Sequence, residues 1–177
     1  MILTLGSCGS KKQRIALPAD FKGPKDAQAA GIAAVYQHPT SYPHLSVAEN
    51  IFMGHEIIKH KMIQWKAMNE EANKLLKQLN ADFDATAEMG TLSVAQQQMV
   101  EIAKALSTHA KIVILDEPTA SLTRRESEEL YRIVDQLKEE GVSIIFISHR
   151  FEDMYRLASR VTVFRDSQYI GTYDVDG

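Results

Sequence analysis

Short apolar runs of strand length alternate along this 177-residue chain with segments whose apolar residues recur at helical spacing. The runs are 31–37, 111–117, 142–148 and 160–165. Each is apolar almost throughout, which is typical of strands that are buried on both faces of a sheet. Continuously apolar strands that alternate with helices indicate an α/β fold, with a mostly parallel sheet covered on both faces.

Apolar residues three and four positions apart predict helices over 63–80, 93–107 and 124–141. The last of these segments ends in Gly141, which suits the residue that follows a helix C-terminus. After the last apolar run, the polar residues 165–168 predict a tight turn into a further strand. The chain is therefore expected to end in a β-hairpin.

Length and composition favour a soluble protein with one domain, or one domain with a small appendage. The net charge of −3 provides no basic field, so nucleic acid is not the expected partner. Cys8 is the only cysteine, which fits a reducing compartment. No apolar run approaches the roughly 20 residues that cross a bilayer, and the basic residues at the N-terminus follow the apolar ones, unlike a secretory signal. These features predict a cytoplasmic location.

Two acids come directly out of the most apolar run of the chain. Asp116 and Glu117 follow Leu115 and precede Pro118, which helps to end the strand. Ligands of open parallel sheets bind beyond the carboxyl ends of the strands. There, one carboxylate can hold Mg²⁺ through its water shell while the other orients or deprotonates an attacking water. The alternative is a solvated strand end with a turn-forming aspartate.

Polar residues also end two other predicted strands. Gln37 follows one buried run and His149 follows another. Taken singly, each is more simply explained as a hydrogen-bonded structural residue. Together with the two acids they would bring an amide, two carboxylates and an imidazole to one crevice, which fits hydrolysis of a magnesium nucleotide.

A fourth candidate element is the start of the helix expected over 93–107. Ser93 is a good N-cap, the small Val94 and Ala95 follow it, and no acid appears in the helix before Glu101. A helix N-terminus with a hydroxyl and no carboxylate is suited to binding an anion. The alternative is an ordinary serine cap.

The ordered set of these segments resembles one family. Gln37, "LSVAQQQ" (92–98), "IVILDEPTASLT" (112–123) and "FISHR" (146–150) are similar to the Q-loop, signature, Walker B with D-loop, and H-loop of ABC-type ATPases. The wording is most similar to the ATP-binding subunits of ribose, galactose or xylose-type sugar importers, as in "LSVAENIFMGHE" and "ISHRFEDMYRLASRVTVFRD". Val-Ala in place of the usual Gly-Gly of the signature is a departure that those importers share.

The resemblance implies roles for the strand-end residues, with ATP and Mg²⁺ as cofactors. Gln37 would contact Mg²⁺ or the attacking water and sense the membrane partner. Asp116 would hold Mg²⁺ through water, Glu117 would be the general base, and His149 would bind the γ-phosphate.

The resemblance also implies a site that acts in trans. Ser93, Val94, Ala95 and Gln96 would touch the γ-phosphate of ATP held by an opposing ATPase domain. Residues 120–123, with Ser121 and Leu122, would form the D-loop that links the two sites.

The implied fold is that of P-loop NTPases of the ABC ATPase type, with a helical subdomain inserted into the core sheet. Residues 21–177 would be a partial ABC ATPase domain, in which about 45–107 form the helical subdomain that faces the permease. Residues 1–20 are an atypical N-terminal segment. The implied partners are a second ATPase domain and a membrane permease, which would place the chain on the inner face of the cell membrane.

The P-loop of the family, G-x-x-x-x-G-K-[ST], is missing from the sequence. Residues 6–13, "GSCGSKKQ", are the only candidate, but Ser10 precedes Lys11 where glycine is required and Lys12 follows it where Ser or Thr is required. The pattern is therefore expected to be an ABC ATPase domain without its N-terminal part. The uncovered flank of the sheet predicts self-association, or a covering by residues 1–20.

Two classes of function remain open from the sequence. The first is an ATP-hydrolysing subunit, or a fragment of one, that energises sugar uptake. The lack of a P-loop predicts no measurable hydrolysis by this chain alone. The second is a non-catalytic ABC-like module that only binds a partner. An ABC ATPase outside transport is a third, and the "ENIFMGHE" wording argues against it. Nothing in the sequence identifies the sugar.

Overall fold

The computed structural model describes residues 2–5, 20–36 and 41–175. The chain divides into two compact units. Unit 1 consists of residues 1–37 and 110–177, and unit 2 of residues 38–109. The helical subdomain expected over about 45–107 falls within the bounds of unit 2.

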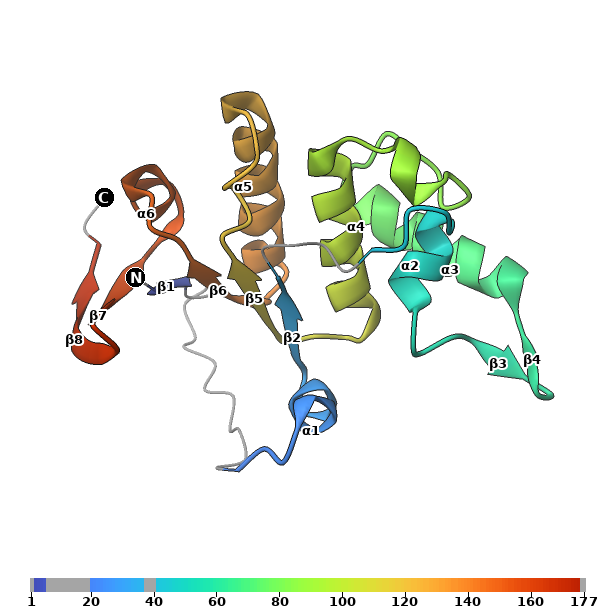
Figure 1. The fold of residues 1–177 in the computed structure, drawn as a ribbon, viewed down its shortest axis with the longest axis horizontal. Coiled ribbons are helices and arrows are strands. Elements are labelled where there is room, and N and C mark those ends of the chain that lie inside the picture. Colours follow the sequence, from blue (N-terminus) through green and yellow to red (C-terminus); the bar gives the residue numbers. More distant parts are fainter. Residues whose placement is uncertain (1, 6–19, 37–40, 176–177) are drawn as a thin grey trace. The chain divides into compact units, whose positions relative to one another are not determined.

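Unit 1 is built on a six-stranded sheet with the strand order β2-β5-β6-β1-β7-β8 (Figure 1). The strands are β1 (Ile2–Leu5), β2 (Ile32–Val35), β5 (Ile112–Asp116), β6 (Ser143–Ile147), β7 (Arg160–Arg165) and β8 (Gln168–Asp174). β2, β5 and β6 pair in parallel, and β1 is antiparallel to both β6 and β7. β7 therefore points the same way as β6, and the expected mostly parallel α/β sheet is confirmed.

β1 comes from the N-terminal segment that the sequence marked as atypical. Its first residue, Ile2, pairs with Ile147 at the end of β6, and its last residue, Leu5, pairs with Ile144 near the start. β1 therefore ends on the side of the sheet where β5 and β6 begin, which is opposite to the side where β5 and β6 end. The glycine- and lysine-containing residues 6–13, considered above as a P-loop candidate, lie outside the described residues.

The helices of unit 1 are α1 (Pro24–Ala29), α5 (Arg124–Glu139) and α6 (Phe151–Leu157). α5 begins at a capping box, in which the Thr123 side chain and Glu126 each bond the other's backbone N–H. It ends as expected before Gly141, whose φ of 89° is accessible mainly to glycine. Leu130, Val134 and Leu137 are buried on its inner face.

The two faces of the central strands are buried to different extents. Val113 and Leu115 of β5 and Ile144 and Phe146 of β6 are fully buried. The alternate residues, among them Ile114 of β5, are only partly buried. The apolar runs had predicted that both faces of the sheet are equally buried. A run of isoleucine and valine does not indicate which face the helices cover.

The predicted C-terminal hairpin is also present. β7 and β8 pair in antiparallel register, and Asp166 and Ser167 form the turn with φ of 50° and 61°. Two consecutive residues with positive φ match the twist of the strands that they connect.

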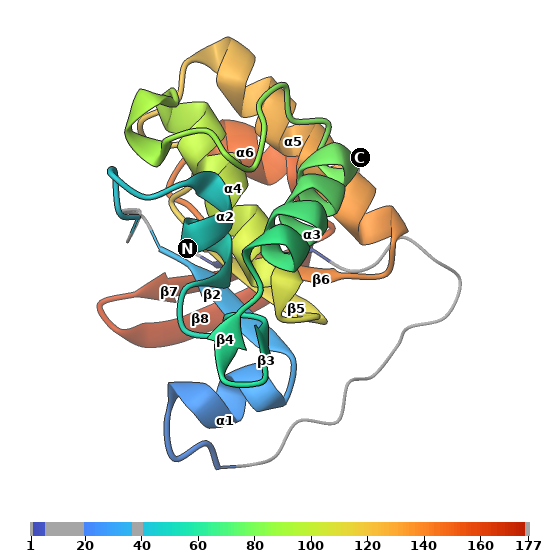
Figure 2. The ribbon, with the colours of Figure 1, turned by 90° about the vertical axis from the view of Figure 1, so that its right-hand side faces the viewer.

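Unit 2 is mainly helical and is seen from a second direction in Figure 2. Its elements are α2 (Val47–Phe52), β3 (Ile58–Lys59), β4 (Met62–Ile63), α3 (Trp65–Gln78), the 3₁₀ turn Met89–Thr91, and α4 (Val94–Ser107). The predicted helices 63–80 and 93–107 correspond to α3 and α4. The three helices pack on one another around the buried side chains of Ile51, Met68, Leu76, Met89 and Ile102. No helix in the described part of the chain is both long and apolar enough to cross a bilayer.

Candidate functional site

The two acids of the sequence lie where the parallel strands end. Asp116 is the last residue of β5, and Glu117 follows it with a φ of 48°, in the left-handed region that non-glycine residues seldom adopt. The backbone N–H of Glu117 still donates to the carbonyl of Ile147 at 2.9 Å. This bond keeps the turn against the end of β6, while the unusual φ redirects the chain away from the sheet.

The structure brings Glu117 and His149 into direct contact. Nδ1 of His149 lies 2.8 Å from Oε1 of Glu117, and the imidazole is largely exposed whereas the carboxylate is 17% exposed. A carboxylate can only accept, so Nδ1 carries the proton of this bond. The predicted convergence of the β5 and β6 strand ends is therefore observed for these two residues, which are 32 positions apart in the sequence.

The second oxygen of Glu117 is buried and has no hydrogen-bond partner among the described residues. An unpaired buried acceptor costs about 1–3 kcal/mol, so such an atom marks a position where a water or a ligand group is expected. Asp116 adds a second, partly exposed carboxylate at the same strand end. A hydrated Mg²⁺ binds proteins through one or two carboxylates and keeps several waters, and these acids fit that requirement.

The third predicted strand-end residue, Gln37, lies outside the described residues, and its role stays a prediction. In the part of the chain that the structure describes, no three histidine, cysteine, aspartate or glutamate side chains form a metal-binding group. Any Mg²⁺ held by the two acids would therefore need ligands from water and from a phosphate.

The signature residues begin helix α4 in unit 2. Ser93 is the N-cap, its Oγ accepts from the N–H of Gln96, and the Gln96 side chain accepts from the N–H of Ser93 at 2.9 Å. Ser93 and Val94 are exposed, and Ala95 and Gln96 are partly exposed. The start of the helix is therefore accessible, as a site that acts in trans would require.

The surroundings of this cap differ from the expectation in one respect. The sequence showed no acid near the start of α4, but Oδ1 of Asp82 accepts a hydrogen bond from Nε2 of Gln96 at 2.9 Å. The loop that precedes α4 brings this carboxylate back to the helix, and sequence spacing gave no sign of it. An anion at this position would have to compete with Asp82 for the Gln96 side chain.

The predicted D-loop residues form a turn between Glu117 and α5. The N–H of Ala120 donates to the carbonyl of Glu117, and the N–H of Leu122 donates to the carbonyl of Thr119. Ser121 is exposed and Leu122 is partly buried. These residues connect the carboxylate of Glu117 with the capped N-terminus of α5 through a short hydrogen-bonded path.

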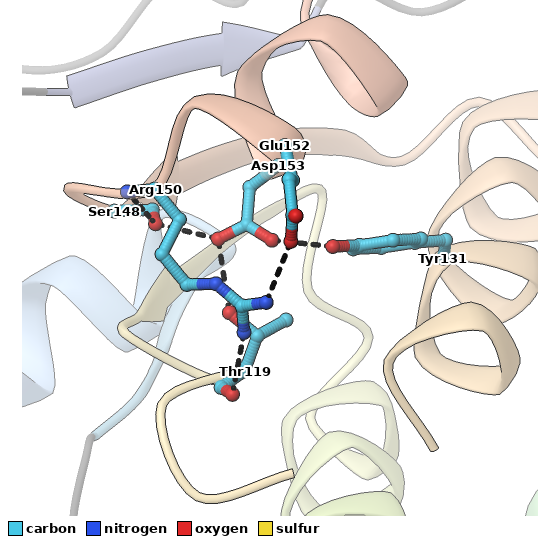
Figure 3. Close-up of polar contacts among 6 residues, drawn as sticks. All are labelled: Thr119, Tyr131, Ser148, Arg150, Glu152 and Asp153. Carbon is cyan, nitrogen blue, oxygen red and sulfur yellow. Dashed lines mark hydrogen bonds and ion pairs between the residues drawn. The ribbon is translucent and has the colours of Figure 1, made fainter. Parts of the chain in front are cut away.

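Sequence reasoning missed a buried network behind this turn (Figure 3). Asp153 of α6 is fully buried and accepts hydrogen bonds from Thr119 at 2.9 Å, from Ser148 at 2.5 Å and from the hydroxyl of Tyr131 at 2.5 Å. Arg150 donates to the carbonyl of Thr119 at 3.1 Å. Asp153 therefore joins the loop that carries Glu117 to the loop that carries His149.

The network also raises the pKa of Tyr131. Burial raises the pKa of Tyr131, and its hydrogen bond to Asp153 raises the pKa further, because an ionised phenol beside a carboxylate is unfavourable. The pKa of the Arg150 guanidinium is also raised, first by its contact with Glu152. No spacing rule could have predicted this cluster, since its members come from α5, α6, the turn after β5 and the loop after β6. Only the polar Ser148, directly after the apolar strand β6, hinted at it.

Comparison with known protein families agrees with the motifs. The profile of the ABC transporter family matches residues 9–120. The chain belongs to the ABC transporter family. Ser93 and Glu117 lie within the residues that this profile matches.

Two relatives illustrate the similarity of this ABC protein to sugar importers. It is 47% identical over 157 residues to the "Putative ribose/galactose/methyl galactoside import ATP-binding protein 1" of Burkholderia ambifaria, covering 89% of this chain and 30% of the relative. It is 45% identical over 159 residues to the "Ribose import ATP-binding protein RbsA 2" of Escherichia coli O157:H7, covering 90% of this chain and 31% of the relative. The ABC chain thus spans about 30% of the length of these relatives.

Solved structures support the ABC ATPase fold. A crystal structure of a nucleotide-free ATP-binding cassette from an ABC transporter matches with a TM-score of 0.76 and 24% identity, over 88% of this chain and 65% of that one. The ADP conformation of an ATP-binding cassette matches with a TM-score of 0.75 and 25% identity, over 87% and 65%. The fold expected from the sequence is confirmed.

Proposed function

We propose that this chain is an ATP-binding part of an ABC-type sugar importer, in which ATP hydrolysis energises carbohydrate uptake. The observation that carries the proposal is the contact of Glu117 with His149 at the carboxyl ends of the strands, where the other glutamate oxygen is buried and has no partner among the described residues. The names of the relatives from Burkholderia ambifaria and Escherichia coli support sugar import as the process. A permease and a second ATPase domain are the proposed partners, at the inner face of the cell membrane.

In this proposal each acid has a separate role. Asp116 would hold Mg²⁺ through a water, and Mg²⁺ would supply positive charge to the transferring phosphoryl group. Glu117 accepts a proton from the attacking water at the oxygen that His149 leaves unpaired. The low exposure of Glu117 favours this role, because a carboxylate shielded from bulk water has fewer competing partners.

The hydrogen bond of His149 to Glu117 limits what its second ring nitrogen can donate. Nδ1 already donates to Glu117, so Nε2 can donate to a γ-phosphate only when the imidazole is doubly protonated. Gln37 would complete the site.

The signature residues act on a different nucleotide. Ser93 to Gln96 form the accessible start of α4, and we assign them to the γ-phosphate of ATP held by a facing ATPase domain. The Ser93 hydroxyl and the helix N-terminus favour an anion, and hydrogen bonds to charged groups contribute about 1.5–3 kcal/mol each. Ser121 and Leu122 would belong to the D-loop that links the two ATP sites of the paired domains.

The first test is hydrolysis by the chain alone. A P-loop supplies several backbone N–H donors and a lysine to the phosphates, and the loss of even one comparable donor costs about 10²–10³ in rate. We expect no measurable phosphate release. Release above background that Glu117→Gln abolishes would contradict this expectation.

The second test is complementation of an intact homologous ATPase domain. The chain is titrated into that domain and phosphate release is followed, with Ser93→Arg as the matched control. We expect stimulation by the wild-type chain and none by Ser93→Arg, whose side chain blocks the facing nucleotide. Absence of stimulation, or equal stimulation by the variant, would exclude a functional half-site in trans.

A second candidate function is a non-catalytic ABC-like module that only binds a partner. The direction of β1 favours this second candidate. β1 ends where β6 begins, which is opposite to the strand ends that carry Glu117 and His149. A phosphate-binding loop that follows β1 directly would start on the wrong side of the sheet. The complementation test separates the two candidates, since a module without a working half-site would bind the partner domain and leave its rate unchanged.

A further inference from the structure

The β3–β4 hairpin of unit 2, residues 58–63, has features that the proposed ATP site does not explain. Ile58 pairs with Ile63 and Lys59 with Met62 across an antiparallel ribbon. His60 and Lys61 form its turn, both with positive φ although neither is glycine. Among the described elements, no helix packs closely against the ribbon, and both views show it beyond the ends of the helices of its unit (Figures 1 and 2).

The hairpin and the residue that follows it expose several large apolar side chains. Ile58 is 62% exposed, Met62 65%, and the adjacent Trp65 at the start of α3 is 52% exposed. Ile63 is exposed as well. A two-stranded ribbon is only marginally stable in water, and exposed apolar residues that gather in one place indicate an interaction surface.

Positive charge lies among these apolar residues. Lys59 and Lys61 flank His60 at the turn, and neither lysine has an ion pair among the described residues. Lys66 follows Trp65 and forms a long ion pair of 3.9 Å with the exposed Glu70. Since the whole chain has a net charge of −3, this basic cluster is a local feature of the hairpin.

A second hairpin in the same molecule shows the contrast. β7 and β8 also expose large apolar side chains, including Tyr169 and Ile170. Their turn carries Asp166, which lies 3.6 Å from Arg165, so it presents no unpaired positive charge. Exposure of apolar residues is thus common to both hairpins, but only the β3–β4 hairpin combines it with unpaired lysines.

We propose that the β3–β4 hairpin binds an anionic lipid surface. Its apolar side chains enter the boundary between head groups and acyl chains, where tryptophan is favoured, and Lys59 and Lys61 lie at the lipid phosphates. The combination of a basic turn, apolar flanks and a tryptophan matches the chemistry of that boundary. Lipid binding by the hairpin requires neither ATP nor a second ATPase domain.

The test uses the purified chain and two kinds of vesicle. One contains phosphatidylglycerol and phosphatidylcholine, and the other contains phosphatidylcholine only. Trp65 is the only tryptophan of the chain, so its fluorescence reports directly on the hairpin. We expect co-sedimentation with the anionic vesicles and a blue shift of the Trp65 emission, both weakened by high salt.

Two pairs of variants locate the binding surface. Lys59→Gln/Lys61→Gln is compared with Lys22→Gln/Lys25→Gln, which makes the same change of charge in unit 1. Each lysine near an anionic membrane contributes about fivefold in affinity, so the hairpin pair should weaken binding about 25-fold and the control pair little. Ile58→Ser should weaken binding, whereas Ile170→Ser, at an isoleucine of similar exposure in the other hairpin, should not.

The proposal is overturned by any of four results. These are no binding to anionic vesicles, equal binding to phosphatidylcholine, equal losses in the hairpin and control variants, and binding that appears only when a permease is present in the vesicle. The last result would identify a protein as the occupant of the hairpin. Because lipid binding and ATP hydrolysis are measured separately, failure here leaves the proposed function untouched, and the reverse also holds.

Discussion

Asp153 is the residue whose removal should destabilise unit 1 most for a single polar change. It is fully buried, and the three hydroxyl donors Thr119, Tyr131 and Ser148 are buried around it. Asp153→Ala removes the shared acceptor and leaves three buried hydroxyls without it. Water cannot replace the acceptor unless the loops move apart.

The magnitude follows from the number and type of bonds. A hydrogen bond to a charged group contributes about 1.5–3 kcal/mol, and each hydroxyl left unsatisfied costs about 1–3 kcal/mol. Three bonds that share one acceptor are not additive, so we expect a loss of about 3–5 kcal/mol, as for other broken buried charged contacts. Tyr131→Phe removes one bond only and should cost about 1.5–3 kcal/mol.

The assay is urea denaturation followed by circular dichroism, with the free energy of unfolding taken by linear extrapolation. Glu152→Ala is the matched control, because this neighbouring carboxylate forms only an exposed ion pair with Arg150, and such pairs contribute about 0–1 kcal/mol. A loss below about 1 kcal/mol for Asp153→Ala would refute the reasoning. So would additive effects of Tyr131→Phe and Asp153→Ala, since residues in direct contact should show coupling.

Two further predictions concern the same unit. The raised pKa of Tyr131 means that the stability it contributes is present below its unfolded value of 10.0 and is lost as pH rises through the folded pKa. The free energy of unfolding should therefore fall more steeply above about pH 10 in the wild type than in Tyr131→Phe, as measured by urea titrations at several pH values. We also predict self-association of the purified chain, because β2 is an edge strand of mostly apolar residues. A single monomeric species in light scattering across a range of concentrations would contradict that prediction.

Much of the fold could be predicted from the sequence because its signals are local. The apolar runs that became β2, β5, β6 and β7 have strand length, and the 3–4 spacing located α3, α4 and α5 to within two residues at their starts. Ser93 was recognisable as an N-cap because a serine before a helical pattern is the usual cap. Such features depend on neighbours a few positions away, which the sequence displays directly.

The short elements were missed because their local signals are too brief. α1, α2 and α6 have six or seven residues each, too few for a periodic pattern to stand out. β3 and β4 have two residues each and carry positive-φ residues other than glycine at their turn, so no turn signal marked them.

The candidate site divides in the same way. The sequence alone identified Asp116, Glu117 and His149, because polar residues at the ends of apolar strands are conspicuous. Tertiary structure decided that one Glu117 oxygen is bound by His149 and that the other has no partner in the part of the chain that the structure describes. It also decided that Asp82 returns to the start of α4. It also decided that Asp153 joins the two loops and that β1 runs against its neighbours. These facts depend on strand direction and on contacts between residues far apart in the chain. Hydrophobic periodicity depends only on neighbouring positions, so it indicates neither the direction of a strand nor its partners.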